Sequence, residues 1–525
     1  MTPRSAEAAK TSSRTYPLLA LFLIVSATLS LIWSHARLLW NDEFLSFYSD
    51  GVATFKQVIL VQLRHPISLD PPTYHLLSHL SMDLIGRNAI ALRLPALGGF
   101  LLFQLCLFFF VRRLAGDRSA IIAMAFPILT ASFRYSVEGR PYGLLLGLYA
   151  LSLLCWQIAT LDDNIPRSRI LPLTGLTLAI ALAITSHYFG VLILIPVSLG
   201  EFSRILIRKR LDMGVLTALI LGLASVGILL PFQRALMVYR QHYYITGVNI
   251  HDISQGYREL FLRYTTWPIP FQKLAAAVMV VLALTLAYAG YQRFKRRPAT
   301  EPAYLWVALV SMALLPFFGY LFGRFVTHTM EVRYVIAALI AFAATFGIVL
   351  ERKLRSDTFY YGSVALILIA AIAINLHSVR QERRDSAAIL ASFKLSPQAA
   401  AALHQNPHEL IYLQSLNDFY LNTYYDPDTT LRPRFSLLYG QPQEIYWLQH
   451  DTNYVTAVNM LAFVPLSLTS YDDFLKQPHP LLILNHSGWE WIDKQLDADH
   501  TSQTIIAPAF RGDLLRVSNP ASASK

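Results

Sequence analysis

Residues 17–33 read PLLALFLIVSATLSLIW, and residues 34–43 continue as SHARLLWNDE. The first part carries no charged residue and approaches the length of about 20 residues that a helix needs to cross the apolar core of a bilayer. The second part becomes polar at once and ends on the acidic pair Asp42 and Glu43. The stretch therefore predicts a membrane span followed by a charged loop. Its apolar core is longer than the 7–15 residues usual in signal peptides, so we expect the span to be retained.

Segments of the same kind recur along the whole chain. Of its 525 residues, 54% are hydrophobic and only 15% are charged, whereas soluble domains carry about 25% charged residues. The pattern predicts a mainly α-helical, polytopic membrane bundle. Its eleven expected spans lie at about 17–36, 95–111, 119–133, 141–159, 170–186, 190–207, 213–232, 273–291, 303–322, 334–350 and 358–377.

The positive charge is concentrated in alternate loops of this bundle. From residue 378 onward the chain has 11 Lys and Arg against 15 Asp and Glu, so the net charge of +11 comes entirely from the membrane part. Short loops rich in Lys and Arg face the cytoplasm, which predicts a cytoplasmic N-terminus, an extracytoplasmic C-terminal segment and a place in the cell (inner) membrane. The positive-inside rule explains the charge without a nucleic-acid partner. The two cysteines, Cys106 and Cys155, fall inside spans and predict no disulfide framework.

Two parts follow from this pattern. Residues 1–377 form the expected transmembrane part, with long outer loops at about 37–94 and 233–272. Residues 378–525 form a separate extracytoplasmic domain, in which 410–413 and 481–484 are short apolar runs typical of buried strands. Each run precedes a segment that could be a helix, which predicts a small α/β domain.

Polar residues that could carry chemistry gather at the outer ends of the spans. Asp42 and Glu43 could be solvated loop acids or helix caps, and a carboxylate there could also act as a general base. Arg140 could extend harmlessly toward the interface or hold a phosphate, because guanidinium matches phosphate geometry. The other candidates are Asp70, Tyr142, His187, Arg333 and Tyr334 in the first, third and later outer segments, and Arg240, His242, Tyr243, Tyr244, His251 and Asp252 in the second long loop.

Several nucleotide and hydrolase motifs are absent from the sequence. There is no Walker A loop, no GxGxxG dinucleotide fingerprint and no GxSxG nucleophile elbow. A soluble nucleotide substrate is therefore not indicated.

In their order and outer position, these elements resemble the GT-C glycosyltransferases, in particular the bacterial relatives of dolichyl-phosphate-mannose protein mannosyltransferases and the lipid A aminoarabinose transferases. The resemblance covers about residues 15–350. It is carried by Asn41-Asp42-Glu43, Asp70-Pro71-Pro72-Thr73-Tyr74, Ala91-Leu92-Arg93-Leu94-Pro95, Glu138-Gly139-Arg140-Pro141-Tyr142, His187-Tyr188 and Arg333-Tyr334.

The resemblance implies a membrane enzyme that uses a polyprenyl-phosphate sugar as donor and an envelope lipid, glycan or protein as acceptor. It implies that Asp42 is the catalytic base, with Glu43 beside it. It also implies donor or phosphate binding by the group Arg140, Arg333, Tyr142, Asp70, His187 and Tyr334. The aminoarabinose transferases have an acidic-Lys-Pro element where this chain has Asp70-Pro71-Pro72. Their metal site uses a histidine of the second long loop; here both His242 and His251 are candidates, so a divalent metal stays open.

Two other classes of function also fit a polytopic chain. A lipid-linked sugar transporter would need many spans and a polar cavity, but transporters usually carry ionisable residues near the midplane of their spans. A membrane scaffold would leave the binding to its outer domain. The gathering of polar residues in the outer loops favours an enzyme at the membrane interface.

Overall fold

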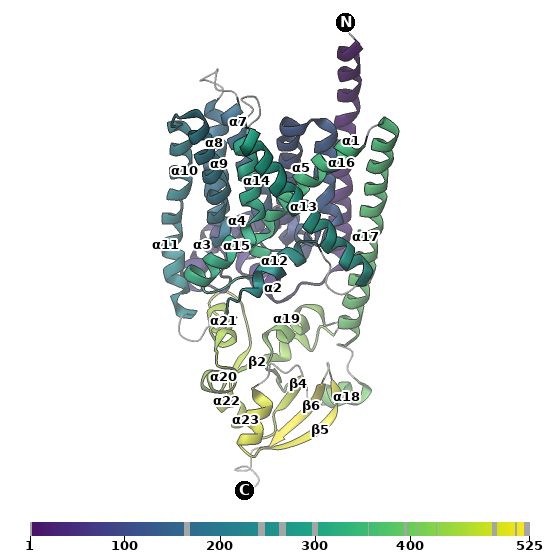
Figure 1. Ribbon diagram of the computed structural model, residues 1–525. Helices are drawn as coiled ribbons and strands as arrows, with labels where there is room; N and C mark the ends of the chain where they lie inside the picture. Colours follow the sequence, from purple (N-terminus) through teal and green to yellow (C-terminus); the bar gives the residue numbers. More distant parts are fainter. Residues whose placement is uncertain are drawn as a thin grey trace. The chain divides into compact units, whose positions relative to one another are not determined.

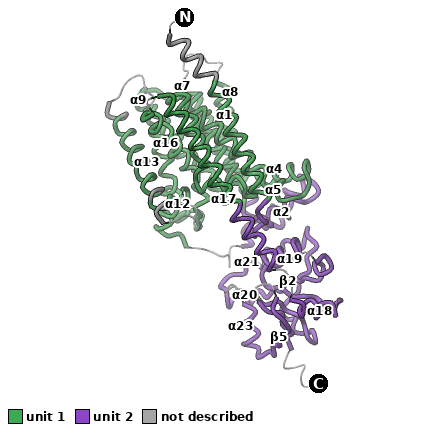
Figure 2. Tube along the Cα trace, turned by 90° about the vertical axis from the view of Figure 1, so that its right-hand side faces the viewer, with its two compact units in different colours: residues 1–35, 70–230, 245–379 green, residues 36–69, 231–244, 380–525 purple. Residues whose placement is uncertain are grey.

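The computed structural model describes residues 3–161, 169–239, 247–261, 269–296, 303–354, 356–392, 396–405, 407–426, 428–485, 491–509 and 512–518. The chain divides into two compact units, each assembled from separate stretches of sequence (Figure 2). The membrane unit comprises residues 1–35, 70–230 and 245–379. The sheet unit comprises residues 36–69, 231–244 and 380–525.

The membrane unit is a bundle of helices (Figure 1). Seven helices are long and apolar enough to cross a bilayer, an eighth span is formed if two helices bent by 54° count as one, and two shorter apolar helices accompany them among the described residues. The predicted count of eleven spans is therefore not confirmed, although the polytopic helical class is. The long or paired elements are α1 (Pro3–Ala36), α5 (Ala89–Ala115), α7 (Tyr142–Leu161), α8 (Ile170–Ser186), α9 (Leu194–Arg208), α10 (Met213–Ala224), α11 (Val226–Ala235), α13 (Ile269–Arg296), α14 (Ala303–Ala313), α15 (Leu315–Phe322), α16 (Leu339–Lys353) and α17 (Asp357–Ser392).

Short elements connect these helices, and one of them, η5, falls within the residues of the sheet unit. They are α4 (Pro72–Ile85), α6 (Asp117–Ala125), η1 (Phe126–Leu129), η2 (Ala131–Ser136), η4 (Tyr188–Ile193), η5 (Leu236–Tyr239), α12 (His251–Phe261), η6 (Gly323–Thr327) and η7 (Val332–Ala338). The segment 119–133, predicted as one span, is broken into α6, η1 and η2. Pro127 has no N–H to continue the α-helical ladder, and Thr130 is extended at φ −95° and ψ 164°.

Helices α5 and α7 pack backbone to backbone through glycine. A Cβ on Gly99 of α5 would overlap the backbone of Leu144, and one on Gly147 of α7 would overlap the carbonyl oxygen of Gly99. Small residues allow such close approach in membranes, where helix association depends on van der Waals packing and interhelical hydrogen bonds. Further along, Gln157 Nε2 donates to the Phe110 carbonyl oxygen at 3.1 Å. Residue numbers rise together on both helices, so α5 and α7 run parallel.

Charged residues from several predicted cytoplasmic segments meet at one end of this bundle. Arg112 Nε, at the end of α5, lies 2.6 Å from Asp117 Oδ1 at the start of α6. Thr15 of α1 donates to the same carboxylate at 3.0 Å, and Arg118 is paired with Asp357 at the start of α17. We call this group the basic end.

One charge network extends into a span. Arg204 of α9 is fully buried, and its guanidinium is hydrogen-bonded to both oxygens of Glu201 at 2.8 and 2.9 Å. Trp156 Nε1 also donates to Glu201, at 2.9 Å. Asp212 also accepts from Arg204 and is paired with Arg169, so the spans are not completely free of charge, but the acids and arginines of this network compensate each other.

The sheet unit is an α/β fold. In the described part of the unit there are six strands, β1 (Ile411–Leu413), β2 (Phe435–Tyr439), β3 (Leu468–Ser470), β4 (Leu481–Asn485), β5 (Ser502–Ala509) and β6 (Gly512–Ser518), in the order β3-β2-β1-β4-β6-β5. Strands β3, β2, β1 and β4 are parallel, and the antiparallel pair β5–β6 extends the β4 edge. The helices of the unit are α2 (Asn41–Asp50), α3 (Phe55–Arg64), α18 (Pro397–Gln405), α19 (Leu416–Tyr425), α20 (Gln441–Leu448), α21 (Thr452–Met460), α22 (Tyr471–Leu475) and α23 (Ile492–Ala498).

The two apolar runs predicted as strands are confirmed. They form β1 and β4, which are neighbours in the sheet, with Ile411 opposite Leu481. Side chains from β4, β6 and the helices build the core, in which Trp491 and Phe474 are fully buried. The hairpin β5–β6 was not predicted, because its exposed strand β5 lacks a continuous apolar run.

Candidate functional site

Asp70 and Arg140 form a buried ion pair in the membrane unit. Arg140 Nη2 lies 2.6 Å from Asp70 Oδ2, and both side chains are more than 90% shielded from solvent. Asp70 stands just before α4, where Pro71 and Pro72 hold the chain in the conformation that begins the helix. Arg140 stands just before α7, in a turn closed by its own N–H donating to the Glu138 carbonyl oxygen at 2.7 Å.

His187 lies on the other side of the Asp70 carboxylate. Its Nε2 is 3.9 Å from Asp70 Oδ1, and its Nδ1 accepts the N–H of Phe189 at 3.2 Å. A ring nitrogen that accepts a hydrogen bond carries no proton, so the proton of the neutral ring sits on Nε2 and faces Asp70. Burial lowers the pKa of His187 to about 4 against the opposing influence of Asp70. The imidazole is therefore uncharged at neutral pH.

Two tyrosines and a second arginine complete the group. The ring of Tyr334 lies 4.6 Å from that of His187, and the ring of Tyr142 lies 5.7 Å from it. The Arg333 guanidinium stands over both tyrosine rings, at 5.6 Å from the Tyr142 centroid and 5.8 Å from the Tyr334 centroid. Such cation–π contacts position a guanidinium without neutralising its charge.

The structure thus brings together six of the eight residues proposed as site residues: Asp70, Arg140, Tyr142, His187, Arg333 and Tyr334. We call these six the outer cluster. They come from the starts of α4, α7 and η7 and from the junction of α8 and η4. Since α5 ends at the basic end and α7 runs parallel to it, Tyr142 at the beginning of α7 lies at the opposite end of the bundle.

Among the six residues of the outer cluster, positive charge exceeds negative charge. With His187 neutral, its ionised groups are two guanidinium groups and one carboxylate. Asp70 fixes Arg140 in place, and the tyrosine rings fix Arg333. Arginine presents a planar fork of N–H donors that matches the oxygens of a phosphate, so a buried cluster of this composition can hold an anion.

The remaining two proposed residues, Asp42 and Glu43, belong to the sheet unit. They occupy the first turn of α2, where negative charge is favoured by the helix dipole. Glu43 is completely buried, while Asp42 is partly exposed. Helix α2 packs on α19 through aromatic rings, with Phe44 5.2 Å from Tyr420. The two adjacent acids thus differ in burial, and only Asp42 is accessible.

Part of the second long loop lies outside the described residues. Arg240, His242, Tyr243 and Tyr244 lie outside the described residues. His251 begins α12 on an exposed surface, and Asp252 accepts the N–H of Asn249 at 2.8 Å. Within the described ranges no group of three or more His, Cys, Asp or Glu side chains is arranged to hold a metal ion, so the choice between His242 and His251 stays open.

One pair beside the outer cluster was not proposed from the sequence. Arg134 Nη2 lies 3.7 Å from the buried carboxylate of Glu138, and the ring of Tyr135 lies 5.6 Å from that of Tyr142. The four-residue spacing of Arg134 and Glu138 is a signal for such a pair only if the segment is helical. Because 119–133 was expected to be a span, the short helix η2 was not foreseen.

Comparisons with known proteins agree with this architecture. Residues 69–233 match the family described as dolichyl-phosphate-mannose-protein mannosyltransferase, and this segment contains Asp70, Arg140, Tyr142 and His187. The fold resembles ArnT from Cupriavidus metallidurans in crystal structures bound to undecaprenyl phosphate and in the apo state. The TM-scores are 0.58 and 0.56, with 16% and 14% sequence identity.

The first of these matches covers 96% of this chain and 98% of the ArnT chain, and the second covers 95% and 97%. At this level of identity the likeness concerns the fold alone. No curated protein sequence matches the chain. Residues 69–233 thus match the model of a mannosyltransferase family, and the chain as a whole shares the fold of ArnT.

Proposed function

We propose that this chain transfers a hexosyl or pentosyl group from a polyprenyl-phosphate carrier to an acceptor hydroxyl on the extracytoplasmic side of the membrane. The observation that carries the proposal is the outer cluster, in which two arginines and one buried carboxylate converge at the end of the bundle opposite the basic end. The undecaprenyl phosphate bound in the ArnT structure supports a donor of this chemical class.

Arg140 and Arg333 are the proposed ligands of the donor phosphate. A phosphate at a membrane interface needs fixed cationic donors, because a mobile side chain would lose conformational entropy on binding. Asp70 supplies this fixation for Arg140 through the 2.6 Å contact. A neutral His187 adds an N–H donor beside Asp70 without adding charge. Tyr142 and Tyr334 offer phenolic hydroxyls and aromatic faces to the sugar phosphate.

Asp42 is the proposed general base. It is partly exposed, whereas Glu43 is completely buried and Asp70 is held by Arg140. Only an accessible carboxylate can approach an acceptor hydroxyl within hydrogen-bond distance. Glu43 is then a positioning residue that holds the first turn of α2.

The proposed reaction is one displacement at the anomeric carbon. The acceptor oxygen attacks C1, its proton passes to the Asp42 carboxylate, and the bond from C1 to the phosphate oxygen breaks on the opposite face. The electron pair leaves with the lipid phosphate, and the configuration at C1 is inverted. The departing phosphate is a stable anion and needs no general acid. Arg140 and Arg333 stabilise the charge that develops on it.

The test is transfer by the purified full-length chain in nanodiscs. Radiolabelled polyprenyl-phosphate sugars are supplied with an extract of envelope lipids and glycans, and the product is identified by mass spectrometry. We expect labelled product with the wild type, and a loss of about 10²–10⁴-fold with Asp42→Asn, as is typical when a positioned base is removed. No transfer from any polyprenyl-phosphate sugar would overturn the proposal; near-normal transfer by Asp42→Asn would overturn the assignment of the base.

A further inference from the structure

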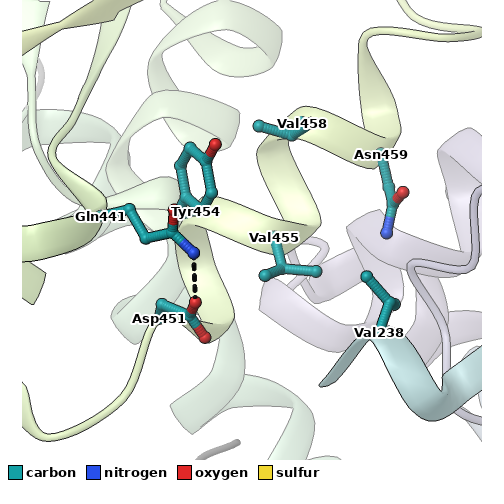
Figure 3. Close-up of a pocket in the computed structure, with 7 residues that line it drawn as sticks. All are labelled: Val238, Gln441, Asp451, Tyr454, Val455, Val458 and Asn459. Carbon is teal, nitrogen blue, oxygen red and sulfur yellow. Dashed lines mark hydrogen bonds between the residues drawn. The ribbon is translucent and has the colours of Figure 1, made fainter. Parts of the chain in front are cut away.

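The sheet unit contains a pocket that the proposed reaction does not use. It has a volume of about 230 Å³ and is lined by Val238, Gln441, Asp451, Tyr454, Val455, Val458 and Asn459 (Figure 3). Helix α21 supplies four of these residues. Gln441 and Asp451 lie on one side of the pocket, and Asn459 and Val238 lie on the other, with Val455 between them (Figure 3).

The arrangement of Asp451 differs from that of an ordinary capping residue. Asp451 is the N-cap of α21, where an aspartate side chain usually accepts an N–H from the first turn. Here it makes no such bond. The N–H of Tyr454 donates instead to Glu444 Oε2 at 3.3 Å. Asp451 is left to accept Gln441 Nε2 at 2.8 Å in the wall of the pocket.

The lining chemistry suits a ligand with several hydroxyl groups. Asp451 only accepts hydrogen bonds, Gln441 and Asn459 both donate and accept, and Tyr454 adds a phenol and an aromatic ring. A sugar hydroxyl also donates and accepts, so neighbouring hydroxyls can satisfy a carboxylate and a carboxamide together. Among the seven described lining residues there is no Lys, Arg or His. A phosphate would therefore meet a carboxylate and no compensating cation.

The volume limits the size of the ligand. Pockets for drug-sized molecules have about 300–1,000 Å³, and this one has about 230 Å³. The pocket is large enough for a single sugar ring but too small to bury a longer stretch of glycan. Val458 is 41% exposed, so the pocket is open on its side. A glycan could then place one ring inside while the rest of its chain continues into solvent.

The pocket helix is tied to the first outer loop within the sheet unit. Asn459 Nδ2 donates to the carbonyl oxygen of Pro66 at 3.1 Å, and Tyr239 donates to the same oxygen at 2.8 Å. The Tyr239 hydroxyl is also within 3.2 Å of Thr456 on α21. A ligand that contacts Asn459 would therefore affect the position of Pro66, which lies four residues before Asp70 in the sequence.

We propose that this pocket binds one neutral or amino-substituted sugar ring of a glycan, and that the glycan is the acceptor of the transferred sugar. The assignment of the acceptor rests on the proposed function. The binding of a sugar ring does not, because it follows from the lining alone. The enzyme then recognises its acceptor through the sheet unit and its donor through the outer cluster.

Binding is tested first, on the full-length chain in detergent without any donor. The probes are methyl α-D-glucopyranoside and its 2-amino-2-deoxy analogue, observed by saturation-transfer NMR. We expect saturation transfer at millimolar concentration with the wild type. With Asp451→Asn we expect an affinity at least about tenfold weaker, which corresponds to a loss of about 1.4 kcal/mol of binding free energy. Val458→Trp, at an exposed position, should block the pocket without disturbing its buried polar groups.

The matched control is Asp497→Asn. Asp497 also accepts a glutamine amide in the sheet unit, from Gln503 at 3.1 Å, but on an exposed surface, and its replacement should leave the NMR signal unchanged. Absence of saturation transfer with both probes, or its persistence in Val458→Trp, would overturn the pocket assignment.

The source of the sugar is tested second, by kinetics. If the ligand is the acceptor, Val458→Trp raises KM for the acceptor glycan and leaves KM for the lipid donor unchanged. Unchanged acceptor KM in a variant that no longer binds the glycosides would refute the acceptor role and leave a site for a free sugar. A failure of the proposed function would give a different result. No lipid donor would then support transfer, but the two glycosides would still bind to the pocket.

Discussion

Asp70 and Arg140 are seventy residues apart in the sequence and meet at 2.6 Å in the membrane unit. Neither the DPPTY segment nor the EGRPY segment specifies this partnership. Truncating one partner of a buried pair leaves an uncompensated charge, which typically costs about 3–5 kcal/mol. A variant that removes either partner would therefore lose activity through destabilisation alone, whatever the role of the pair in binding. An experiment on function must change the geometry of the guanidinium while keeping its charge.

Arg140→Lys meets this requirement. Lysine keeps the positive charge beside Asp70 but lacks the planar fork that contacts two phosphate oxygens at once. We expect kcat/KM for the lipid donor to fall by about 10²-fold, the effect of removing one donor from a preorganised anion site. Arg112→Lys is the matched control, because Arg112 also lies 2.6 Å from an aspartate, but at the basic end. Equal kinetics in the two variants would show that Arg140 serves only structure.

Arg333 is held differently, so its replacement should act differently. Its guanidinium stands over the rings of Tyr142 and Tyr334. Tyr142→Leu removes one of these faces and keeps Arg333 itself. If Arg333 binds the donor phosphate from this position, Tyr142→Leu should raise the donor KM several-fold and Arg333→Gln should raise it further. A donor KM that responds to neither substitution would remove Arg333 from the site.

The orientation of the bundle is a prediction from charge. Arg112 and Arg118 lie at one end, each paired with an aspartate, and the outer cluster lies at the other end. We expect reporter fusions after Lys209 to be active in the cytoplasm and fusions after the last residue to be active outside, in accordance with the positive-inside rule. The two reporters landing on one side of the membrane would contradict the eleven-span topology.

The membrane class could be predicted because the free energy of inserting an apolar helix is largely a local property of its sequence. The strands β1 and β4 could be predicted for a similar reason, since each is a short run of buried apolar residues. The broken segment around Pro127 and Thr130 could not be predicted. Its residues are apolar enough for a span, and only packing among the neighbouring elements determines where the helix ends.

The candidate site was predictable as a set of residues but not as an arrangement. Asp70, Arg140, His187 and Arg333 could be selected from the sequence, because each is a polar residue next to a long apolar segment. The partnership of Asp70 with Arg140 depends on how α4 and α7 pack, which the sequence does not encode locally. The sheet-unit pocket was missed entirely. In sequence, Asp451 looks like an ordinary helix cap, and its replacement in that role by Glu444 appears only in the structure.

The glycine contact between α5 and α7 makes a prediction with an internal control. A Cβ on Gly99 would overlap the backbone of Leu144, whereas a Cβ on the adjacent Gly98 meets nothing within 4 Å. Gly99→Ala should separate the helices and destabilise the protein by about 1–3 kcal/mol, as overpacking typically does. Gly98→Ala should be neutral or stabilising, because alanine favours a helix over glycine by about 1 kcal/mol. Thermal unfolding in detergent measures both, and equal melting temperatures would refute the close contact.

The last prediction concerns the pH dependence of stability. Burial raises the pKa of Glu444 from its usual 4.5 to about 8. The folded sheet unit therefore keeps a proton on Glu444 that the unfolded chain releases above pH 4.5. Stability follows the difference in bound protons between the two states, so this group lowers stability as pH rises from about 5 to 8. One pKa unit corresponds to about 1.4 kcal/mol, and the loss by pH 8 should reach a few kcal/mol.

Glu444→Gln removes this titration and keeps an oxygen that can accept the Tyr454 N–H. We expect its melting temperature to exceed that of the wild type increasingly as pH rises from 5 to 8, when the full-length proteins are compared in the same detergent. Glu409→Gln, which alters a surface acid 3.6 Å from Arg516 in the same unit, is the matched control for a change of one carboxylate to an amide. A difference between Glu444→Gln and wild type that is constant with pH, or that shrinks as pH rises, would show that Glu444 is not held protonated. In that case the Glu444 side chain that accepts the Tyr454 N–H would be a charged carboxylate. The carboxylate of Asp451 in the pocket wall would then have a second negative charge near it.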